Sequence, residues 1–97
     1  MTDVIFVEEH PAKGKEHHAL PGSIVGRDNC DILLPDPEIS RRHAAVRQVD
    51  EDVAIEDLES KNGTFVNGER VTGIKRLKHG DGVRFGNTVL RVSAPRA

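Results

Sequence analysis

The sequence contains no tryptophan and no tyrosine, and its only aromatic residues are Phe6, Phe65 and Phe85. Binding of single-stranded nucleic acid has little support, because such sites stack the bases on aromatic side chains. Cys30 is the one cysteine, which excludes an intramolecular disulfide and favours a reducing, cytoplasmic compartment. The longest apolar runs extend over a few residues, too short for a membrane-spanning helix.

No charge of one sign dominates the chain. Fourteen Lys and Arg stand against sixteen Asp and Glu, a net charge of −2, so we expect neither nucleic acid nor a membrane surface as partner. The charges are unevenly placed, since residues 50–60 hold six acids and no base, and residues 61–91 hold seven bases against two acids. The simplest interpretation is a pair of solvated faces. The basic stretch 61–91 remains an alternative binding surface, for an unmodified protein or for nucleic acid, although the acidic segment 50–60 and the net charge of −2 count against nucleic acid.

The apolar residues that are present suit one small domain built from strands. Ile and Val together number seventeen against six Leu, and β-branched residues favour strands. No window of helical length has an apolar period of 3.6 residues. We place the domain at residues 1–94 of the 97, with residues 95–97 as a tail or the start of a linker.

Alternating apolar residues between turn signals predict about ten short strands. The expected strands are 4–7, 23–27, 31–34, 44–49, 53–58, 64–66, 69–71, 83–85 and 88–92. Residues 50–52 should form the turn of one hairpin, and Asn67-Gly68 suits a tight turn because Asn and Gly tolerate positive φ. So many short strands predict an all-β fold, a β-sandwich of two packed, mainly antiparallel sheets.

Polar residues concentrate in three of the predicted loops, and loops at one end of a sandwich often carry function. They contain, in order, Gly26-Arg27, then Ser40-Arg41-Arg42-His43, then Lys61-Asn62-Gly63-Thr64. The ordered set of Gly-Arg, Ser-x-x-His and Asn-Gly-Thr, followed by a second Asn-Gly, resembles the signature of the forkhead-associated (FHA) domain family. The resemblance extends over roughly residues 4–93. It implies an eleven-stranded sandwich whose loops at one end bind phosphothreonine in a partner protein.

The residue types in these loops suit a phosphate. Phosphothreonine carries about −1.5 to −2 charges and three strong acceptor oxygens. Arg27 offers a planar fork of N–H donors, Ser40 offers a hydroxyl, and Arg41 adds a second cation. The resemblance places these three residues at phosphate-contacting positions. It places Asn62 where the family binds the peptide backbone, and an amide side chain has both a donor and an acceptor for that task.

Other residues of the three loops are expected to support the site. Lys61, Arg42 and Glu38 are candidate peripheral contacts with phosphate or peptide. The resemblance implies that the loop holding position 38 helps select residues C-terminal to the phosphothreonine, so an acid there argues against acidic residues and in favour of apolar or basic ones. We assign the site's architecture to Gly26, His43, Gly63 and Thr64. The resemblance implies that the histidine orders its loop and that the glycines allow the turns.

Catalytic and metal-binding interpretations have weaker support. Ser40 and His43 do not form a convincing nucleophile and base, because no Gly-x-Ser-x-Gly elbow is present and no acid is placed to orient the histidine. His10, His17, His18 and Cys30 lack the paired spacing of a structural zinc site. The Gly-rich nucleotide loops are also missing. We therefore expect no enzyme, no metal and no cofactor.

The sequence thus predicts a phosphothreonine-dependent binding module in Ser/Thr kinase signalling. Its expected partner is a phosphothreonine-containing protein or peptide, such as a Ser/Thr kinase or a kinase substrate. We expect the isolated domain to be a monomer. The alternative is a phospho-independent interaction or assembly module that uses a sheet face or the basic stretch 61–91.

Overall fold

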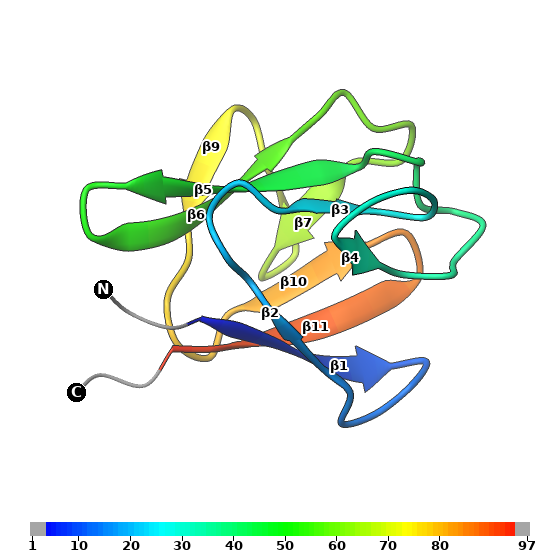
Figure 1. Ribbon diagram of the computed structural model, residues 1–97, viewed down its shortest axis with the longest axis horizontal. Helices are drawn as coiled ribbons and strands as arrows, with labels where there is room; N and C mark the ends of the chain where they lie inside the picture. Colours follow the sequence, from blue (N-terminus) through cyan, green and yellow to red (C-terminus); the bar gives the residue numbers. More distant parts are fainter. Residues whose placement is uncertain (1–3, 95–97) are drawn as a thin grey trace.

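A computed structural model describes residues 4–94, which form eleven strands and no helix. The strands are short and follow one another closely along the chain (Figure 1). Their bounds are β1 Ile5–His10, β2 Glu16–His18, β3 Ile24–Gly26, β4 Ile32–Leu33, β5 Ala44–Val49, β6 Asp52–Asp57, β7 Thr64–Val66, β8 Glu69–Arg70, β9 Ile74–Arg76, β10 Gly82–Phe85 and β11 Thr88–Ser93.

The strands form two sheets that pack face to face (Figure 1). The six-stranded sheet has the order β2-β1-β11-β10-β7-β8, and the five-stranded sheet has the order β4-β3-β5-β6-β9. Among the described strands, β3 and β4 pair in parallel, and every other pair is antiparallel. The predicted β-sandwich of mainly antiparallel sheets is confirmed.

The predicted hairpin and turn also form. Strands β5 and β6 pair in continuous register from Ala44 opposite Asp57 to Val49 opposite Asp52, with Asp50 in the turn at φ 55°. Asn67 and Gly68 have φ values of 52° and 84° and connect β7 to β8. Two strands were not expected from the sequence, β2 and β9.

The core lies between the sheets and extends under the loops at one end. The largest fully buried apolar side chains are Phe6, Phe85, Leu34, Ile39, Ile55 and Leu90. Leu34 and Ile39 come from the segment between β4 and β5 and anchor that segment to the core. Burial of each such side chain stabilises the fold by about 1.5–3 kcal/mol, and it fixes the backbone of the neighbouring polar residues.

Two further expectations concern the predicted tail and a membrane span. The predicted tail, residues 95–97, lies outside the described residues. Across residues 4–94, the structure has no helix with the length and apolar character needed to cross a membrane.

Candidate functional site

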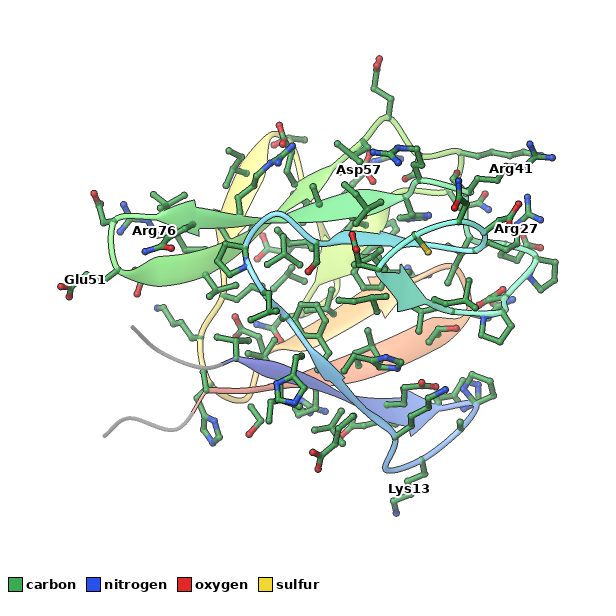
Figure 2. All side chains as sticks on the ribbon, in the orientation of Figure 1. Lys13, Arg27, Arg41, Glu51, Asp57 and Arg76 are labelled. Atoms are coloured by element: carbon green, nitrogen blue, oxygen red, sulfur yellow. The ribbon has the colours of Figure 1, made fainter. Side chains whose placement is uncertain are left out.

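Three loops meet at the end of the sandwich opposite the β5–β6 turn. There they surround a surface hollow that is lined by Arg27, Pro37, Glu38, Ile39, Ser40, Arg41, Lys61 and Asn62. Figure 2 shows Arg27 and Arg41 at this end, and Glu51 and Arg76 at the opposite end. The structure therefore brings together six of the seven residues predicted to contact phosphate or peptide, because Arg42 alone does not line the hollow.

Arg27 directly follows β3, and its position is fixed by its neighbours. Its backbone N–H donates to the carbonyl of Ser40 at 3.2 Å, and its Nε donates to the carbonyl of Ile39 at 2.9 Å. Within residues 4–94, the two terminal guanidinium nitrogens make no hydrogen bond. Arg27 is exposed, so these donors face solvent from a backbone-anchored side chain.

Ser40 connects two of the loops. Its backbone N–H donates to Nδ1 of His43 at 3.0 Å, and its Oγ accepts a hydrogen bond from the backbone N–H of Lys61, also at 3.0 Å. A hydroxyl that accepts one bond still has its own proton to donate. The half-buried Ser40 therefore has a fixed Oγ and an available donor at the edge of the hollow.

His43 is fully buried beneath the hollow and hydrogen-bonds to the loop of Ser40 and to the loop of Gly63. Because Nδ1 accepts the bond from Ser40, the ring proton is on Nε2, which donates to the carbonyl of Gly63 at 2.8 Å. The ring also makes an edge contact with Phe85, with centroids 5.5 Å apart. Both ring nitrogens are thus bonded to backbone groups of the two loops that line the hollow.

An acid does lie near this histidine, contrary to the sequence-based expectation. An oxygen of Asp57 is 4.0 Å from Nε2 of His43. His43 directly precedes β5 and Asp57 ends β6, 14 positions later in the sequence, so no local motif signals the contact. The histidine proton still points to Gly63, and Oγ of Ser40 is bonded to Lys61, so the three residues do not form a nucleophile-base-acid relay.

Asp57 instead organises the loop between β6 and β7. Its carboxylate accepts bonds from the backbone N–H and the hydroxyl of Ser60, at 3.1 and 2.5 Å, and from Oγ1 of the fully buried Thr64 at 2.8 Å. The Ser60 hydroxyl oxygen in turn accepts from the N–H of Gly63 at 2.9 Å. Burial acts to raise the pKa of Asp57, but the hydrogen bonds from Ser60 and Thr64 outweigh it, and the pKa is lowered.

Asp36 performs a similar task for the loop between β4 and β5, and sequence reasoning missed it too. It accepts bonds from the N–H of Glu38 at 2.9 Å, the N–H of Asn87 at 2.8 Å and the hydroxyl of Thr88 at 2.8 Å. Burial opposes ionisation, yet the bonds from Glu38, Thr88 and Asn87 lower the pKa of Asp36. The bond to Glu38 is a local turn pattern that Asp residues favour. The partners at 87 and 88 depend on the fold.

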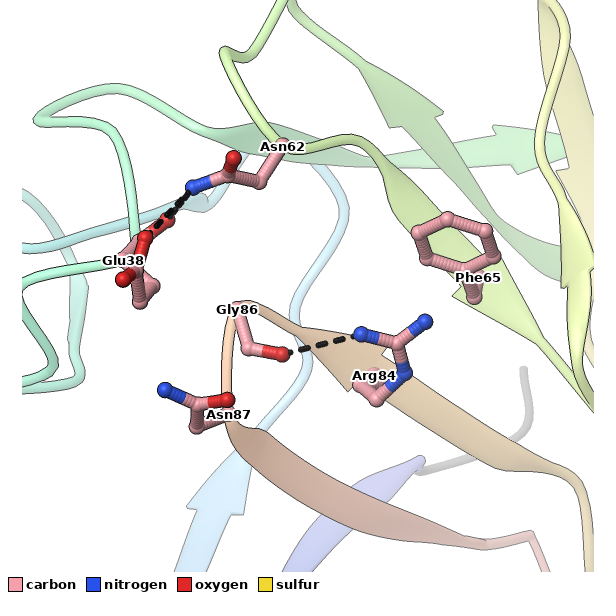
Figure 3. A pocket seen from close by; sticks show the side chains of 6 residues that line it. All are labelled: Glu38, Asn62, Phe65, Arg84, Gly86 and Asn87. Carbon is pink, nitrogen blue, oxygen red and sulfur yellow. Dashed lines mark hydrogen bonds between the residues drawn. The ribbon is translucent and has the colours of Figure 1, made fainter.

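Asn62 and Glu38 both line the hollow and lie against each other. Figure 3 shows the two side chains in a neighbouring pocket that they also line. Nδ2 of Asn62 donates to the backbone carbonyl of Glu38 at 2.7 Å and to its carboxylate at 3.0 Å. The amide is therefore oriented before any partner binds, with its oxygen left to accept a bond. Glu38 is thus a direct neighbour of the residue predicted to hold the peptide chain.

Two glycines at the site serve different purposes. Gly63 has φ +86°, in the region that side chains disfavour, as expected for a turn. Gly26 has no positive φ and lies at the end of β3. A Cβ at Gly26 would lie 1.8 Å from the carbonyl oxygen of Arg41, so this position requires glycine for close backbone approach and not for a turn.

The basic stretch 61–91 does not form one continuous surface. Arg76 pairs with Asp50 at 2.7 Å and with Asp52 at 3.4 Å, so the acidic and basic segments partly neutralise each other. Arg91 pairs with Glu9 at 2.9 Å. The alternative of binding through the whole stretch is weakened, because its cations are divided between different faces.

Two of the residues considered for metal binding, His17 and Cys30, have other contacts. Nε2 of His17 lies 2.6 Å from a carboxylate oxygen of Glu8. Cys30 is half-buried, its thiol donates to the carbonyl of Ile32 at 3.3 Å, and burial raises its pKa. In the part of the chain from 4 to 94, no group of three His, Cys, Asp or Glu side chains is arranged to hold a metal ion.

Comparison with known proteins identifies relatives of this chain. The FHA domain family model matches residues 23–86. Nibrin from Danio rerio is 46% identical over 66 residues, an alignment that covers 65% of this chain and 8% of nibrin. The chain therefore spans only a small part of that relative.

Solved structures agree with the family match. One FHA domain with phosphothreonine-dependent interactions superimposes with a TM-score of 0.87 at 31% identity, covering 98% of this chain and 99% of the other. The FHA domain of FhaA, crystallised in complex with the intracellular domain of another protein, has a TM-score of 0.81 at 33% identity, covering 92% and 98%. The chain belongs to the FHA domain family, whose members are binding modules.

Proposed function

We propose that this FHA domain binds a phosphothreonine-containing segment of a partner protein in Ser/Thr kinase signalling. The observation that carries the proposal is the hollow in which the anchored guanidinium of Arg27, the hydroxyl of Ser40 and the side chain of Arg41 meet. Donors that are fixed before binding lose little conformational entropy when a ligand arrives. Such a set suits a small anion with several acceptor oxygens.

The phosphate would be held by charge-assisted hydrogen bonds. In residues 4–94, Nε of Arg27 is hydrogen-bonded and the two terminal nitrogens are not, and such a guanidinium suits phosphate oxygens. Ser40 supplies a neutral donor beside it, and Arg41 supplies a second positive charge. Lys61 lines the same hollow, and we assign it a peripheral contact. Arg42 is exposed outside the lining and is the weaker candidate for such a contact.

The peptide chain would be held by Asn62. Its amide oxygen is available as an acceptor for a backbone N–H, and its orientation is fixed by Glu38. We assign Gly26, His43, Gly63 and Thr64 to the architecture that sets the positions of these groups. Recognition of this kind involves binding without chemistry, so we propose a non-enzymatic role that requires no cofactor.

The partner and its setting follow from the same proposal. We propose a Ser/Thr kinase or a kinase substrate as the phosphorylated partner, bound by a monomeric domain in the cytoplasm. The FhaA relative binds an intracellular domain, which supports an intracellular partner here. We propose residues 1–94 as the extent of the domain.

Calorimetry with a phosphothreonine peptide, selected from a degenerate library, tests this proposal. Wild-type protein should bind the phosphorylated peptide and not its unphosphorylated counterpart. Arg27→Ala and Ser40→Ala should each lower the affinity about ten- to a hundredfold, as expected for loss of a charged hydrogen-bond partner worth about 1.5–3 kcal/mol. Equal affinity of both variants and the wild type would show that the assigned site is wrong. Retained binding of unphosphorylated peptide would favour the phospho-independent alternative.

A further inference from the structure

The sandwich has four edge strands, β2 and β8 in the six-stranded sheet and β4 and β9 in the five-stranded sheet. An edge strand presents backbone N–H and C=O groups to which another chain can pair. All three residues of β9 are exposed, and Ile74 is 50% exposed, one of three exposed large hydrophobic residues in residues 4–94. Strands β2 and β8 contain none of the three. Strand β4 contains Leu33, but it has two residues, and the carbonyl of Ile32 already accepts a hydrogen bond from the thiol of Cys30 at 3.3 Å. Strand β9 is therefore the edge best suited to pair with another chain.

The register of β9 shows which of its backbone groups are open. The N–H of Leu77 donates to the carbonyl of Val53 at 2.9 Å, so these two residues form a hydrogen-bonded pair. Such pairs alternate with non-hydrogen-bonded pairs along an antiparallel ladder, so Lys75 also bonds to β6. Ile74 and Arg76 therefore direct their N–H and C=O groups away from β6, and no loop or side chain in residues 4–94 bonds to these groups.

The side chains of β9 offer an apolar surface and one free charge. Ile74 and Arg76 lie on the outer face of the sheet, opposite Glu56 and Ala54 of β6, because the alternate residues of β6 belong to the core. Arg76 pairs with two carboxylates at the β5–β6 turn, at 2.7 and 3.4 Å, so its charge is offset. Lys75 is exposed, and none of the ion pairs in residues 4–94 involves it.

Lys75 decides what kind of chain can pair with this edge. If β9 of a second copy paired with all three residues, the two copies of Lys75 would lie opposite each other in a non-hydrogen-bonded pair, where side chains are closest. Like charges at such positions are destabilising, and opposite charges are stabilising. The lysine therefore opposes self-pairing of this edge but favours a strand that carries an acid at the same position.

We infer that β9 binds an extended acidic segment of a partner protein, which adds to the five-stranded sheet as an antiparallel strand. The backbone groups of Ile74 and Arg76 supply affinity, and alternating side chains supply specificity. In this register an acid lies opposite Lys75, and the next residue of the partner, which is apolar, lies opposite Ile74 on the outer face.

The contact needs no phosphate and does not rest on the proposed function. No residue of β9 lines the hollow next to Arg27, and Arg76 lies at the opposite end of the sandwich from Arg27 (Figure 2). The two surfaces are thus separate, and a partner can use β9 whether or not it is phosphorylated.

Peptide selection followed by binding measurements tests the inference. A displayed library of random unphosphorylated peptides is selected on wild-type protein, and the enriched peptides are titrated by fluorescence anisotropy. Arg76→Pro removes an outward N–H at a position where an edge strand tolerates proline, and Arg76→Ala, the matched control, keeps that N–H. Lys75→Glu reverses the free charge. Lys13→Glu changes the net charge equally in an exposed loop that lies apart from Arg76 (Figure 2).

The enriched peptides should share an acid followed by an apolar residue. Arg76→Pro should bind them about fivefold more weakly than Arg76→Ala, through loss of a backbone hydrogen bond. Lys75→Glu should weaken binding at least about twofold to fivefold, the range for an exposed ion pair, and Lys13→Glu should leave it unchanged. Hydrogen exchange followed by NMR should slow at the amides of Ile74 and Arg76 when peptide binds, and stay unchanged at Lys75.

The inference is overturned if no acidic-apolar peptide is enriched, if the two Arg76 variants bind equally, or if exchange at Ile74 and Arg76 does not slow. Thermal unfolding checks each variant, and if Arg76→Pro does not fold, the exchange measurement decides. Dimer formation in sedimentation velocity that Lys75→Glu alters would assign the edge to a second copy and contradict the inference. Failure of the proposed function looks different, since it appears as equal binding of phosphorylated and unphosphorylated peptides at the hollow.

Discussion

Substitution of Gly26 by alanine should separate two backbone segments that the site needs in contact. A Cβ at this position would lie 1.8 Å from the carbonyl oxygen of Arg41 and 2.8 Å from its carbonyl carbon. An ordinary contact begins near 3.4 Å, so β3 and the loop before β5 would have to move apart by about 1.6 Å. No flexible side chain can absorb this shift, because both closest atoms belong to the backbone.

The hydrogen bonds across this contact allow the cost to be estimated. The N–H of Arg27 bonds to Ser40 at 3.2 Å, and the N–H of His43 bonds to Val25 at 2.8 Å. Overpacking costs about 1–3 kcal/mol, and each weakened bond adds about 1 kcal/mol. We expect Gly26→Ala to lower the free energy of unfolding by about 3 kcal/mol and to weaken phosphopeptide binding more than tenfold.

Urea unfolding followed by circular dichroism measures the stability, and calorimetry measures the affinity. Gly82→Ala is the matched control, since Gly82 also lies in a strand without positive φ, and its Cβ would meet no atom closer than 3.5 Å. The control should keep wild-type affinity and change the free energy of unfolding by less than about 1 kcal/mol. If Gly26→Ala matched Gly82→Ala in both measurements, the close-approach argument would be refuted.

Three further results are expected. His43→Ala removes the bonds to Ser40 and Gly63 and leaves a buried cavity, so urea unfolding should show a free energy of unfolding lower by about 3 kcal/mol. Ser40→Ala should unfold close to wild type, and equal losses in the two variants would contradict the division between positioning and contact residues. Asp36 and Asp57 have pKa values below the ordinary Asp value of about 4. Their contribution to stability is therefore full above that pH, and it is lost as the pH falls through their pKa values in the folded protein. The free energy of unfolding should therefore fall below about pH 4, and less steeply in Asp57→Asn; identical slopes would count against the hydrogen-bond account. Glu38→Gln keeps an acceptor for Asn62 but removes a negative charge from the hollow that we propose holds the phosphate. Calorimetry at low salt should therefore show about a twofold to threefold gain in affinity for the phosphopeptide, and a loss would contradict the proposed position of the phosphate.

Strand alternation and turn residues were sufficient to predict most of the sandwich, because one face of each long strand is buried. Strands β2 and β9 could not be predicted from the sequence, for a physical reason. Residues 16–18 are polar, and all three residues of β9 are exposed, so neither segment carries the alternation of a half-buried strand. Each forms because it completes the edge of a sheet, pairing with β1 or β6.

The residues that face the hollow could be identified from a local pattern, but the residues that position them could not. Arg27, Ser40 and Asn62 belong to short ordered motifs. Asp36 bonds to Thr88, 52 residues away in the sequence, and that contact exists only after the two sheets have packed. Phe65 of β7 likewise lies opposite Arg70 and Arg84 only because of the register of three strands, which no spacing in the sequence predicts.

NMR titration can follow, residue by residue, the proposed capture of phosphothreonine at the loop end of the sandwich. A library-selected phosphothreonine peptide is added to labelled wild-type protein, followed by its unphosphorylated counterpart. The phosphorylated peptide should shift the amide signals of Arg27, Ser40, Arg41 and Asn62, and the unphosphorylated peptide should shift none of them at the same concentration. Shifts confined to a sheet face or to the β5–β6 turn would show that the peptide binds elsewhere. Equal shifts with both peptides would show that binding does not depend on the phosphate.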